Sequence, residues 1–418
     1  MGRLLRPRHK SKKRTALFEL FLDQHGERAP LQEALSAAMA CINFERRGTY
    51  ENLFSGLGLN CKHAEVLNKW NFSLKAIVQH LGLNIIGEVD ESIYSSAILT
   101  SSGAEAICHV HQSVYFSEMR ETGKNHVLIL SSSPAPFHSA LAQLEPLGIV
   151  IQQVKTTVGS IDLEDFESKL TPRTALVSLP LHDALIGSAE PIEKIAKMCH
   201  ARHIALHIDI SASLGRSYID FETIRPDYIT LCAKALGAPF PSGLLIKKKD
   251  ANLMPLISGD PSQSGLRAGG ASLPILKGVE VAIKNAQDSF YEVTMEVAHQ
   301  KAMLKQKLAR NERILFFESS TEQLPDVLCF GFKGIKGELF AHALSMEGIY
   351  VSLGGMNLPA LCQLIESKGV DFAEAQTAVS IRLPVGLSES ELDWAVEKIF
   401  EVAEKLEGLD RANQEEPR

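Results

Sequence analysis

The sequence predicts an α/β protein with a large, mostly parallel sheet domain followed by a smaller α+β domain. Its 418 residues, 45% apolar and 22% charged, can bury a large core and exceed the size of one ordinary domain. From about residue 65 onward, short apolar runs alternate with amphipathic helical segments, which is typical of a parallel sheet covered on both faces. A Gly-rich stretch at 258–270 precedes a long helical pattern at 274–310, where we expect the domain change.

The two ends of the chain differ from this pattern. Residues 3–14 form a basic run without an acid, which predicts a disordered tail or a segment with an RNA-binding, membrane-surface or targeting role. Apolar residues at helical spacing over 16–40 predict a helical arm. The predicted segments are a basic tail (1–15), an N-terminal helical arm (16–70), a large α/β domain (71–275), a small α+β domain (276–405) and a polar tail (406–418).

Ten apolar runs are predicted as strands. Helices are expected between them, for instance at 139–147 and 192–202 in the large domain and at 338–347 and 390–406 in the small one. The strands of the large domain are predicted at 97–100, 126–130, 150–154, 174–179, 204–209, 228–232 and 243–247, and those of the small domain at 327–332, 348–353 and 379–383.

Composition narrows the class of protein. The net charge of -7 disfavours general nucleic-acid binding. No apolar run approaches the roughly 20 residues that a membrane-spanning helix needs, so no membrane span is expected. The seven cysteines are scattered and never form a CxxC pair, which predicts reduced thiols in the cytoplasm. His109 and His111 would face different sides of a helix, so no metal site is expected.

Three features are expected to meet at one edge of the large sheet. Asp209 ends one predicted strand and Lys234 lies just beyond the next, and open α/β sheets bind ligands at the carboxyl ends of their strands. Upstream, the turn at 101–103 leaves a strand and enters an Ala-rich helix, so its backbone N–H groups could bind an anion. Taken singly, the Asp and Lys are typical of surface charges, and the turn is typical of an ordinary helix cap.

The order of these features resembles the class V aminotransferase family, and most closely its cysteine desulfurase branch. TSSGAEA (100–106) is similar to the family's phosphate-binding TSGATEA, HIDISASLG (207–215) to HVDAAQSLG, and CAKALGAPFPSGLLI (232–246) to GHKFYGPKGIGALYI. Similar matches occur at 266–282 and 380–393, so the resemblance runs from about residue 55 to 405. It implies the aspartate aminotransferase-like fold of the enzymes that depend on pyridoxal 5'-phosphate (PLP).

The resemblance also implies roles for individual residues. Lys234 would be the catalytic residue that carries PLP as a Schiff base, and Arg382 would bind the substrate carboxylate, for which a guanidinium fork is suited. A salt bridge at the strand end is the alternative for Arg382. Arg267 would lie at the subunit boundary of a homodimer. The residues implied to bind the cofactor are Ser102, Gly103, Ala104, Asp209, Thr230 and Lys234.

Several positions depart from the family pattern. The histidine that stacks on the cofactor aligns near Pro134, with His138 as a substitute or as a surface residue. The cysteine of the desulfurase loop aligns with Met356 and Asn357, and Cys362 lies where the next helix should begin. The other departures are Ala184, where His182 or Asp183 could substitute, and Ala212, Ala233 and Gly270.

These departures leave three hypotheses open. The first is a PLP-dependent enzyme that acts on an amino acid but lacks an aligned loop cysteine. The second is a desulfurase that uses Cys362. The third is a degenerate, non-catalytic paralogue that serves as a binding or regulatory partner, for example of an iron–sulfur assembly or sulfur-acceptor protein. Retention of Asp209, Lys234 and Arg382 favours catalysis, whereas the substituted cofactor contacts favour its loss.

Overall fold

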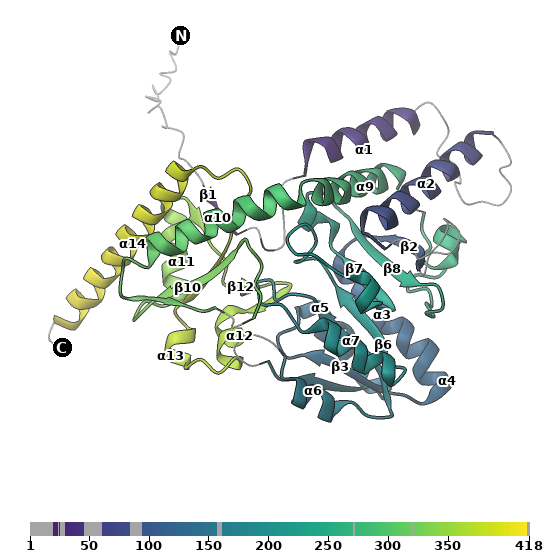
Figure 1. Ribbon diagram of the computed structural model, residues 1–418, viewed down its shortest axis with the longest axis horizontal. Coiled ribbons are helices and arrows are strands. Elements are labelled where there is room, and N and C mark those ends of the chain that lie inside the picture. The colour runs from purple at the N-terminus through teal and green to yellow at the C-terminus, as the bar shows by residue number, and fades with distance from the viewer. Residues whose placement is uncertain are drawn as a thin grey trace, which may run out of the picture.

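The computed structural model describes residues 20–23, 25, 30–45, 61–83, 94–156, 161–270, 272–318 and 321–415. Its centre is a seven-stranded sheet of order β2-β8-β7-β6-β5-β3-β4, with β8 antiparallel to both of its neighbours and the other pairs parallel (Figure 1). All seven predicted strands of the large sheet are present. They are β2 (Tyr94–Thr100), β3 (His126–Leu130), β4 (Val150–Val154), β5 (Thr174–Pro180), β6 (Ala205–Asp209), β7 (Tyr228–Leu231) and β8 (Gly243–Lys248).

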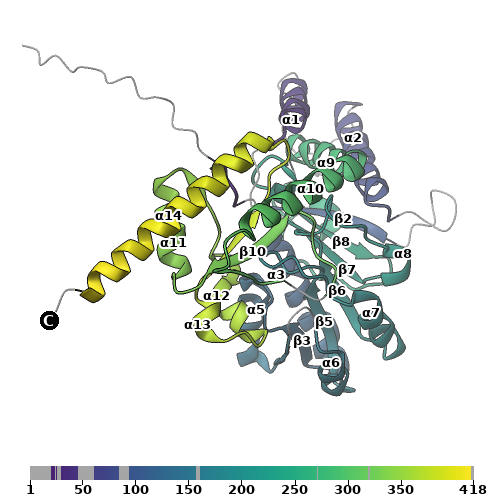
Figure 2. The same ribbon diagram turned by 60° about the vertical axis from the view of Figure 1, so that its left-hand side comes forward.

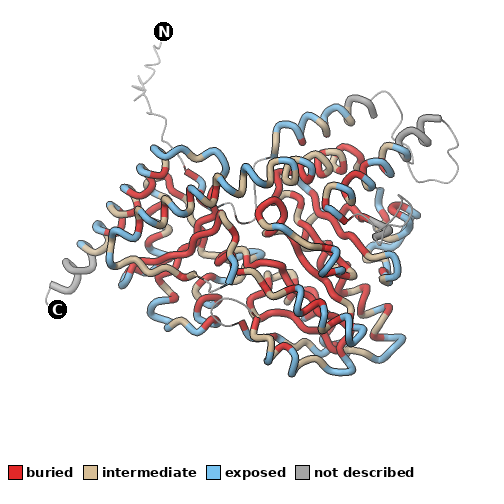
Figure 3. The backbone as a smooth tube through the Cα atoms, in the orientation of Figure 1, coloured by how far each residue is buried: buried red, intermediate tan, exposed pale blue. Residues whose placement is uncertain are grey.

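The inner strands of this sheet are buried, as Figure 3 shows, and apolar residues pack on both of its faces. On β6, Leu206 and Ile208 join a core cluster that includes α7 (Ile192–Ala201) and α9 (Leu273–Asp288). On the opposite face, residues such as Leu176 of β5 pack with α3 (Gly103–Val114) and α5 (Ala135–Ala142). Because side chains alternate along a strand, His207 and Asp209 lie on the α3 face.

Two long helices follow the sheet where one helical pattern is predicted. α9 packs against α1 (Gln32–Glu45) and α2 (Cys61–His80), and its Leu276 and Ile283 belong to the core of the large sheet. After Ser289, α10 (Phe290–Leu308) leads to a second core, to which its Leu304 contributes. Figures 1 and 2 show this second core beside the large sheet, with α14 on its outer side.

The second core surrounds a small antiparallel sheet of order β14-β10-β9. Its strands are β9 (Ile314–Phe316), β10 (Val327–Phe332) and β14 (Ala378–Arg382), and α11 (Gly337–Met346) and α14 (Glu389–Glu415) pack with them. Of the predicted strand at 348–353, only Ile349–Tyr350 forms a strand, β11. The remaining short helices described are α4 (Arg120–Thr122), α6 (Leu163–Lys169), α8 (Phe221–Ile224), α12 (Leu361–Ser367) and α13 (Phe372–Ala375).

The helical arm predicted from residue 16 differs near its start. Leu20 and Phe21 form a strand, β1, which pairs in parallel with Ile349–Tyr350. Leu20 and Leu22 are buried and Phe21 between them is exposed, which is the alternation of a strand rather than the period of a helix. The helix α1 begins only at Gln32. Among the described residues, no helix combines the length and apolar character needed to cross a membrane.

Candidate functional site

Asp209 ends β6 as a buried carboxylate. Its Oδ2 accepts a hydrogen bond of 2.7 Å from the Thr230 hydroxyl, and its Oδ1 accepts one of 3.1 Å from the Ser211 backbone N–H. Burial raises the pKa of Asp209, and the hydrogen bonds from Thr230 and Ser211 oppose that rise. Within the part of the chain that the structure describes, no cationic side chain forms an ion pair with it. The carboxylate is therefore suited to pair with a cation that a ligand brings.

Lys234 lies in a 3-10 turn (Ala233–Leu236) that follows β7, the strand next to β6. Its Nζ lies 4.7 Å from the centroid of the Phe240 ring. Cys232, at the start of this turn, lies close enough to Asp209 and Lys234 for the charges of both to change the pKa of its thiol. Burial raises the pKa of the Cys232 thiol most, Asp209 raises it further, and Lys234 lowers it. The structure thus brings Asp209 and Lys234 to the same neighbourhood, around Cys232.

The turn predicted to bind an anion lies beside the same cysteine. A Cβ atom added to Gly103 would lie 3.0 Å from the Cys232 Cβ, and one added to Gly243 of β8 would lie 2.3 Å from the carbonyl carbon of Ser102. Both glycines therefore allow the start of α3 to pack closely against β8 and the Lys234 turn. Ala104, in the first turn of α3, is half-buried.

The N-terminus of α3 is also capped by its own side chains. The Ser102 hydroxyl accepts from the Glu105 backbone N–H at 3.1 Å, and a Glu105 carboxylate oxygen accepts from the Ser101 backbone N–H at 2.7 Å. Arg267 binds the same Glu105 carboxylate, with Nε 2.5 Å from Oε1. Burial raises the pKa of Glu105, but the hydrogen bond from Arg267 and those from Ser101 outweigh it, so the pKa is lowered. The predicted place of Arg267 at a subunit boundary remains a prediction.

Thr230 takes a different place from the other predicted cofactor residues. It is fully buried in β7, and its hydroxyl contacts the Asp209 carboxylate and, at 2.9 Å, Nε2 of His207. The hydroxyl is therefore committed to the support of Asp209. The role of Thr230 as a phosphate contact remains a prediction.

Arg382 lies at the end of β14 and is only 3% exposed. Its Nε donates to Oδ2 of Asp326 at 3.0 Å and its Nη2 donates to the Ala212 carbonyl at 2.8 Å. Arg216 donates to the same Asp326 oxygen at 2.7 Å. The second interpretation made from the sequence, a salt bridge at the strand end, therefore describes the arrangement present. Asp326 and Arg216 carry no motif, so sequence reasoning missed both.

The residues weighed as substitutes are buried or hydrogen-bonded to the protein. His182 Nδ1 contacts the Ser213 hydroxyl at 2.9 Å, and burial, helped by the charge of Arg382, lowers the pKa of His182 to about 4. Asp183 caps the following turn by accepting from the backbone N–H groups of Leu185 and Ile186 at 2.8 and 2.9 Å. His138 lies on α5, where burial lowers its pKa.

The segment predicted from the sequence to align with the desulfurase loop is a hairpin of β12 (Gly354–Gly355) and β13 (Leu358–Ala360). Met356 at its tip is 97% exposed, and the Asn357 carbonyl accepts from the Ala135 backbone N–H at 2.9 Å, beside Pro134. Cys362 follows as the second residue of α12, on a helix as expected, and it is partly exposed. Burial and the nearby Glu366 and Glu338 raise the pKa of its thiol.

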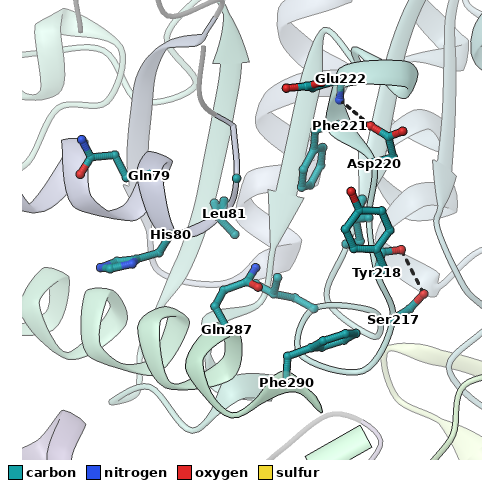
Figure 4. Close-up of a pocket in the computed structure, with 13 residues that line it drawn as sticks. Gln79, His80, Leu81, Ser217, Tyr218, Asp220, Phe221, Glu222, Gln287 and Phe290 are labelled. Atoms are coloured by element: carbon teal, nitrogen blue, oxygen red, sulfur yellow. Dashed lines mark hydrogen bonds between the residues drawn. The ribbon is translucent and has the colours of Figure 1, made fainter. Parts of the chain in front are cut away.

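A cavity of about 380 Å³ lies elsewhere, between the end of α2, the loop after β6 and the junction of α9 with α10. Figure 4 shows Tyr218, Phe221, Gln287 and Phe290 around it. None of the residues that line it is a predicted site residue. Its open, mixed lining does not indicate one class of ligand.

Comparisons with known proteins find related sequences. The sequence profile of the family described as aminotransferase class-V matches residues 89–370. The chain is 25% identical over 329 residues to cysteine desulfurase IscS 1 of Archaeoglobus fulgidus, which covers 77% of this chain and 86% of that protein. It is 28% identical over 342 residues to the NifS/IcsS protein homolog of Lactobacillus delbrueckii subsp. bulgaricus, covering 81% and 82%.

Solved structures give the same fold. A NifS-like protein superposes with a TM-score of 0.81 at 21% identity, covering 93% of this chain and 100% of that one. The apo structure of a cysteine desulfurase from Thermococcus onnurineus NA1 superposes with a TM-score of 0.75 at 15% identity, covering 93% and 95%. The α/β fold predicted from the sequence is thereby confirmed.

Proposed function

This chain belongs to the class V aminotransferase family, among cysteine desulfurase-like members, and we propose that it is a PLP-dependent enzyme that acts on an amino acid. The observation that carries the proposal is the buried Asp209 carboxylate. Its two oxygens are held by protein donors, and no cation of the described residues neutralises it. A protonated pyridine nitrogen is a cation that would do so.

The donor set at this place fits the cofactor. Asp209 offers the carboxylate for the pyridine nitrogen, Lys234 offers an amine for the aldehyde, and the α3 turn at Ser102 and Gly103 offers a helix N-terminus for the phosphate. Gly103 and Gly243 keep this turn close to the other two groups, because a side chain at either position would meet Cys232 or the Ser102 backbone. When bound, PLP would supply an electron sink for the substrate carbon.

Residues of the protein would hold the cofactor in place and move the proton. Asp209 would keep the pyridine nitrogen protonated, and the hydrogen bonds that it accepts from Thr230 and Ser211 would hold its carboxylate in place. The Lys234 amine would move a proton to or from the substrate carbon, a role open to an amine that is released from the aldehyde when the substrate amine takes its place. The Phe240 ring over Lys234 would limit the positions of the amine.

A homodimer is part of the proposal. Arg267 would complete the phosphate site near the partner subunit, and its ion pair with Glu105 would tie the start of α3 to the loop that carries it. Sedimentation at several concentrations would test this: a monomer at all of them would contradict it.

A non-catalytic paralogue remains a second candidate because one observation favours it. Arg382, the proposed substrate contact, already donates to Asp326 and to the Ala212 carbonyl, so an amino-acid carboxylate would have to share the guanidinium with these partners. A protein that binds PLP but no amino acid would match this arrangement. A desulfurase that uses Cys362 is less favoured, since this cysteine lies on α12 rather than in a loop, and burial with the nearby Glu366 and Glu338 raises the pKa of its thiol.

Absorbance spectroscopy of the purified protein tests the proposal. We expect a visible band from bound PLP that borohydride bleaches, that Lys234→Ala abolishes, and that shifts when the accepted amino acid is added. Lys234→Arg is the matched control, because it keeps the positive charge but cannot bond to the aldehyde. A colourless protein that takes up no added PLP would sink the proposal. A PLP band that no amino acid shifts would favour the non-catalytic paralogue.

A further inference from the structure

A continuous line of polar side chains crosses the α3 face of the large sheet behind Asp209. Ser178 of β5 lies directly beside His207 of β6, and Thr230 of β7 lies directly beside Asp209. His111 reaches the same line from α3, which covers this face. The neighbouring residues of these strands belong to the apolar core of the other face. The polar groups therefore occupy one row in an otherwise apolar layer.

Four hydrogen bonds join the row from end to end. His111 Nε2 lies 2.8 Å from the Ser178 hydroxyl, which lies 2.7 Å from His207 Nδ1. His207 Nε2 lies 2.9 Å from the Thr230 hydroxyl, which donates to Asp209 Oδ2 at 2.7 Å. Every member is at most 8% exposed, so water does not replace these contacts.

The partners decide which atom carries each hydrogen. Thr230 donates its only hydrogen to Asp209, so its oxygen accepts from His207 Nε2–H. A neutral His207 then has a bare Nδ1, which accepts from the Ser178 hydroxyl, and Ser178 accepts in turn from His111 Nε2–H. All four donors thus point toward the Asp209 carboxylate, and aligned hydrogen bonds polarise one another in the same direction.

Both histidines are held neutral, as this pattern requires. Burial, with His138 as a lesser cause, lowers the pKa of His111 to about 3, and burial lowers the pKa of His207 well below its usual value. The Phe137 ring packs on both imidazoles, stacked on His207 at 5.7 Å between centroids and edge-on to His111 at 5.9 Å. Among the described residues, the charge of His138 acts on His111 at one end of this row, and the charge of Asp209 acts on Cys232 at the other.

We infer that His111, Ser178, His207 and Thr230 form a positioning relay that orients the Asp209 carboxylate and keeps it an acceptor for the pyridine nitrogen. This inference rests on the proposed function, since it gives Asp209 its ligand. The far end of the relay supports this inference. There His111 Nδ1 is buried and has no hydrogen-bond partner, so no group at that end would reverse the direction of the hydrogen bonds. His111, Ser178 and His207 would not touch the cofactor, and in this proposal Thr230 acts on it through Asp209 rather than as the phosphate contact predicted from the sequence.

The first test needs no cofactor. In the full chain labelled with ¹⁵N-histidine, nitrogen chemical shifts should show His207 and His111 as neutral tautomers with hydrogen on Nε2. Thr230→Val, which has nearly the same shape but no hydroxyl, should disturb the His207 signals, whereas Thr230→Ser should keep the parent pattern. A His207 with hydrogen on Nδ1, or one that exchanges between tautomers in the parent protein, would overturn the relay.

The second test uses added PLP. Thr230→Val should weaken PLP binding about tenfold, as expected for the loss of a hydrogen bond to a charged group, and Thr230→Ser should stay within about twofold of the parent. Ser178→Ala should weaken binding in the same direction by a smaller factor. Equal losses in Thr230→Val and Thr230→Ser would indicate packing alone and overturn the inference. If the parent protein binds no PLP, the proposed function fails, and the histidine tautomers still decide whether the relay exists.

Discussion

The Asp209 carboxylate and the Arg382 guanidinium are both buried, but their charges are balanced in different ways. Asp209 is surrounded by neutral donors that point at it, and no cation of the described residues pairs with it. Arg382 already has an internal counterion, Asp326, which it shares with Arg216. The proposed cofactor end of the candidate site thus leaves a charge for a ligand to balance, whereas the proposed substrate end has its charge balanced by the protein.

This difference bears on how far the family's chemistry extends to this chain. A cation that binds at Asp209 gains a partner and displaces none. An anionic substrate at Arg382 must share the guanidinium with Asp326, a buried carboxylate that Arg216 also holds. We therefore expect the substrate carboxylate to bind less favourably at Arg382 than the cofactor binds at Asp209.

The largest effect is expected at Asp326. Asp326→Asn keeps the shape but leaves Arg216 and Arg382 as buried cations without a carboxylate, which should lower the free energy of unfolding by about 3–5 kcal/mol. Urea denaturation measures this. The control is Asp393→Asn, which removes an exposed ion pair with Lys307 and should cost only about 0–1 kcal/mol. Equal losses in the two variants would show that the Asp326 cluster is not a buried counterion.

Glu190 is a second buried carboxylate whose negative charge the surrounding protein only partly stabilises. Burial raises its pKa to about 7, against opposing effects from the Ile161 backbone N–H and Lys368. Because the folded-state pKa is raised above 4.5, the stabilisation is present below pH 4.5 and is lost as the pH rises through 7. The loss amounts to about 3 kcal/mol. Glu190→Gln should remove this part of the pH dependence in denaturation curves measured between pH 4.5 and 8. An unchanged slope would contradict it.

A smaller effect is expected at the α3 turn. Ser102→Ala removes the hydroxyl that accepts from the Glu105 backbone N–H and should lower the free energy of unfolding by about 1 kcal/mol. Ser102→Thr keeps the acceptor and should retain most of the stability. If PLP also binds there, Ser102→Ala should weaken its binding as well, which equilibrium titration would measure. A loss of stability as large in Thr as in Ala would show that the cap is not the cause.

The smallest effect is expected at Cys362. Its raised thiol pKa and its place on α12 predict that Cys362→Ser changes stability by less than about 0.5 kcal/mol and leaves amino-acid-induced changes in the PLP spectrum intact. Sulfide release from cysteine that disappears in this variant would instead establish the Cys362 desulfurase.

The fold could be predicted from the sequence because its strands are doubly buried apolar runs, such as HVLIL at 126–130, and periodicity reports burial directly. The arm near residue 20 could not, since three or four apolar residues fit a helix and a short strand equally, and pairing with Ile349–Tyr350 decided between them.

The candidate site was predictable where a residue lies at a strand end, as Asp209 does. It was not predictable where a partner comes from a distant element, as Asp326 does for Arg382. The sequence did contain a pattern from which the relay could have been predicted. Ser178, His207 and Thr230 interrupt apolar strands at positions that alternation places on one face, and buried polar groups on one face need each other as partners.

Mapping the attached cofactor tests the central claim most directly. The protein is incubated with PLP, reduced with borohydride, digested and analysed by mass spectrometry, in parallel with Asp209→Asn. The account predicts one modified lysine, Lys234, with much less modification in Asp209→Asn at limiting PLP. Modification spread over surface lysines, or equal modification in both proteins, would contradict it.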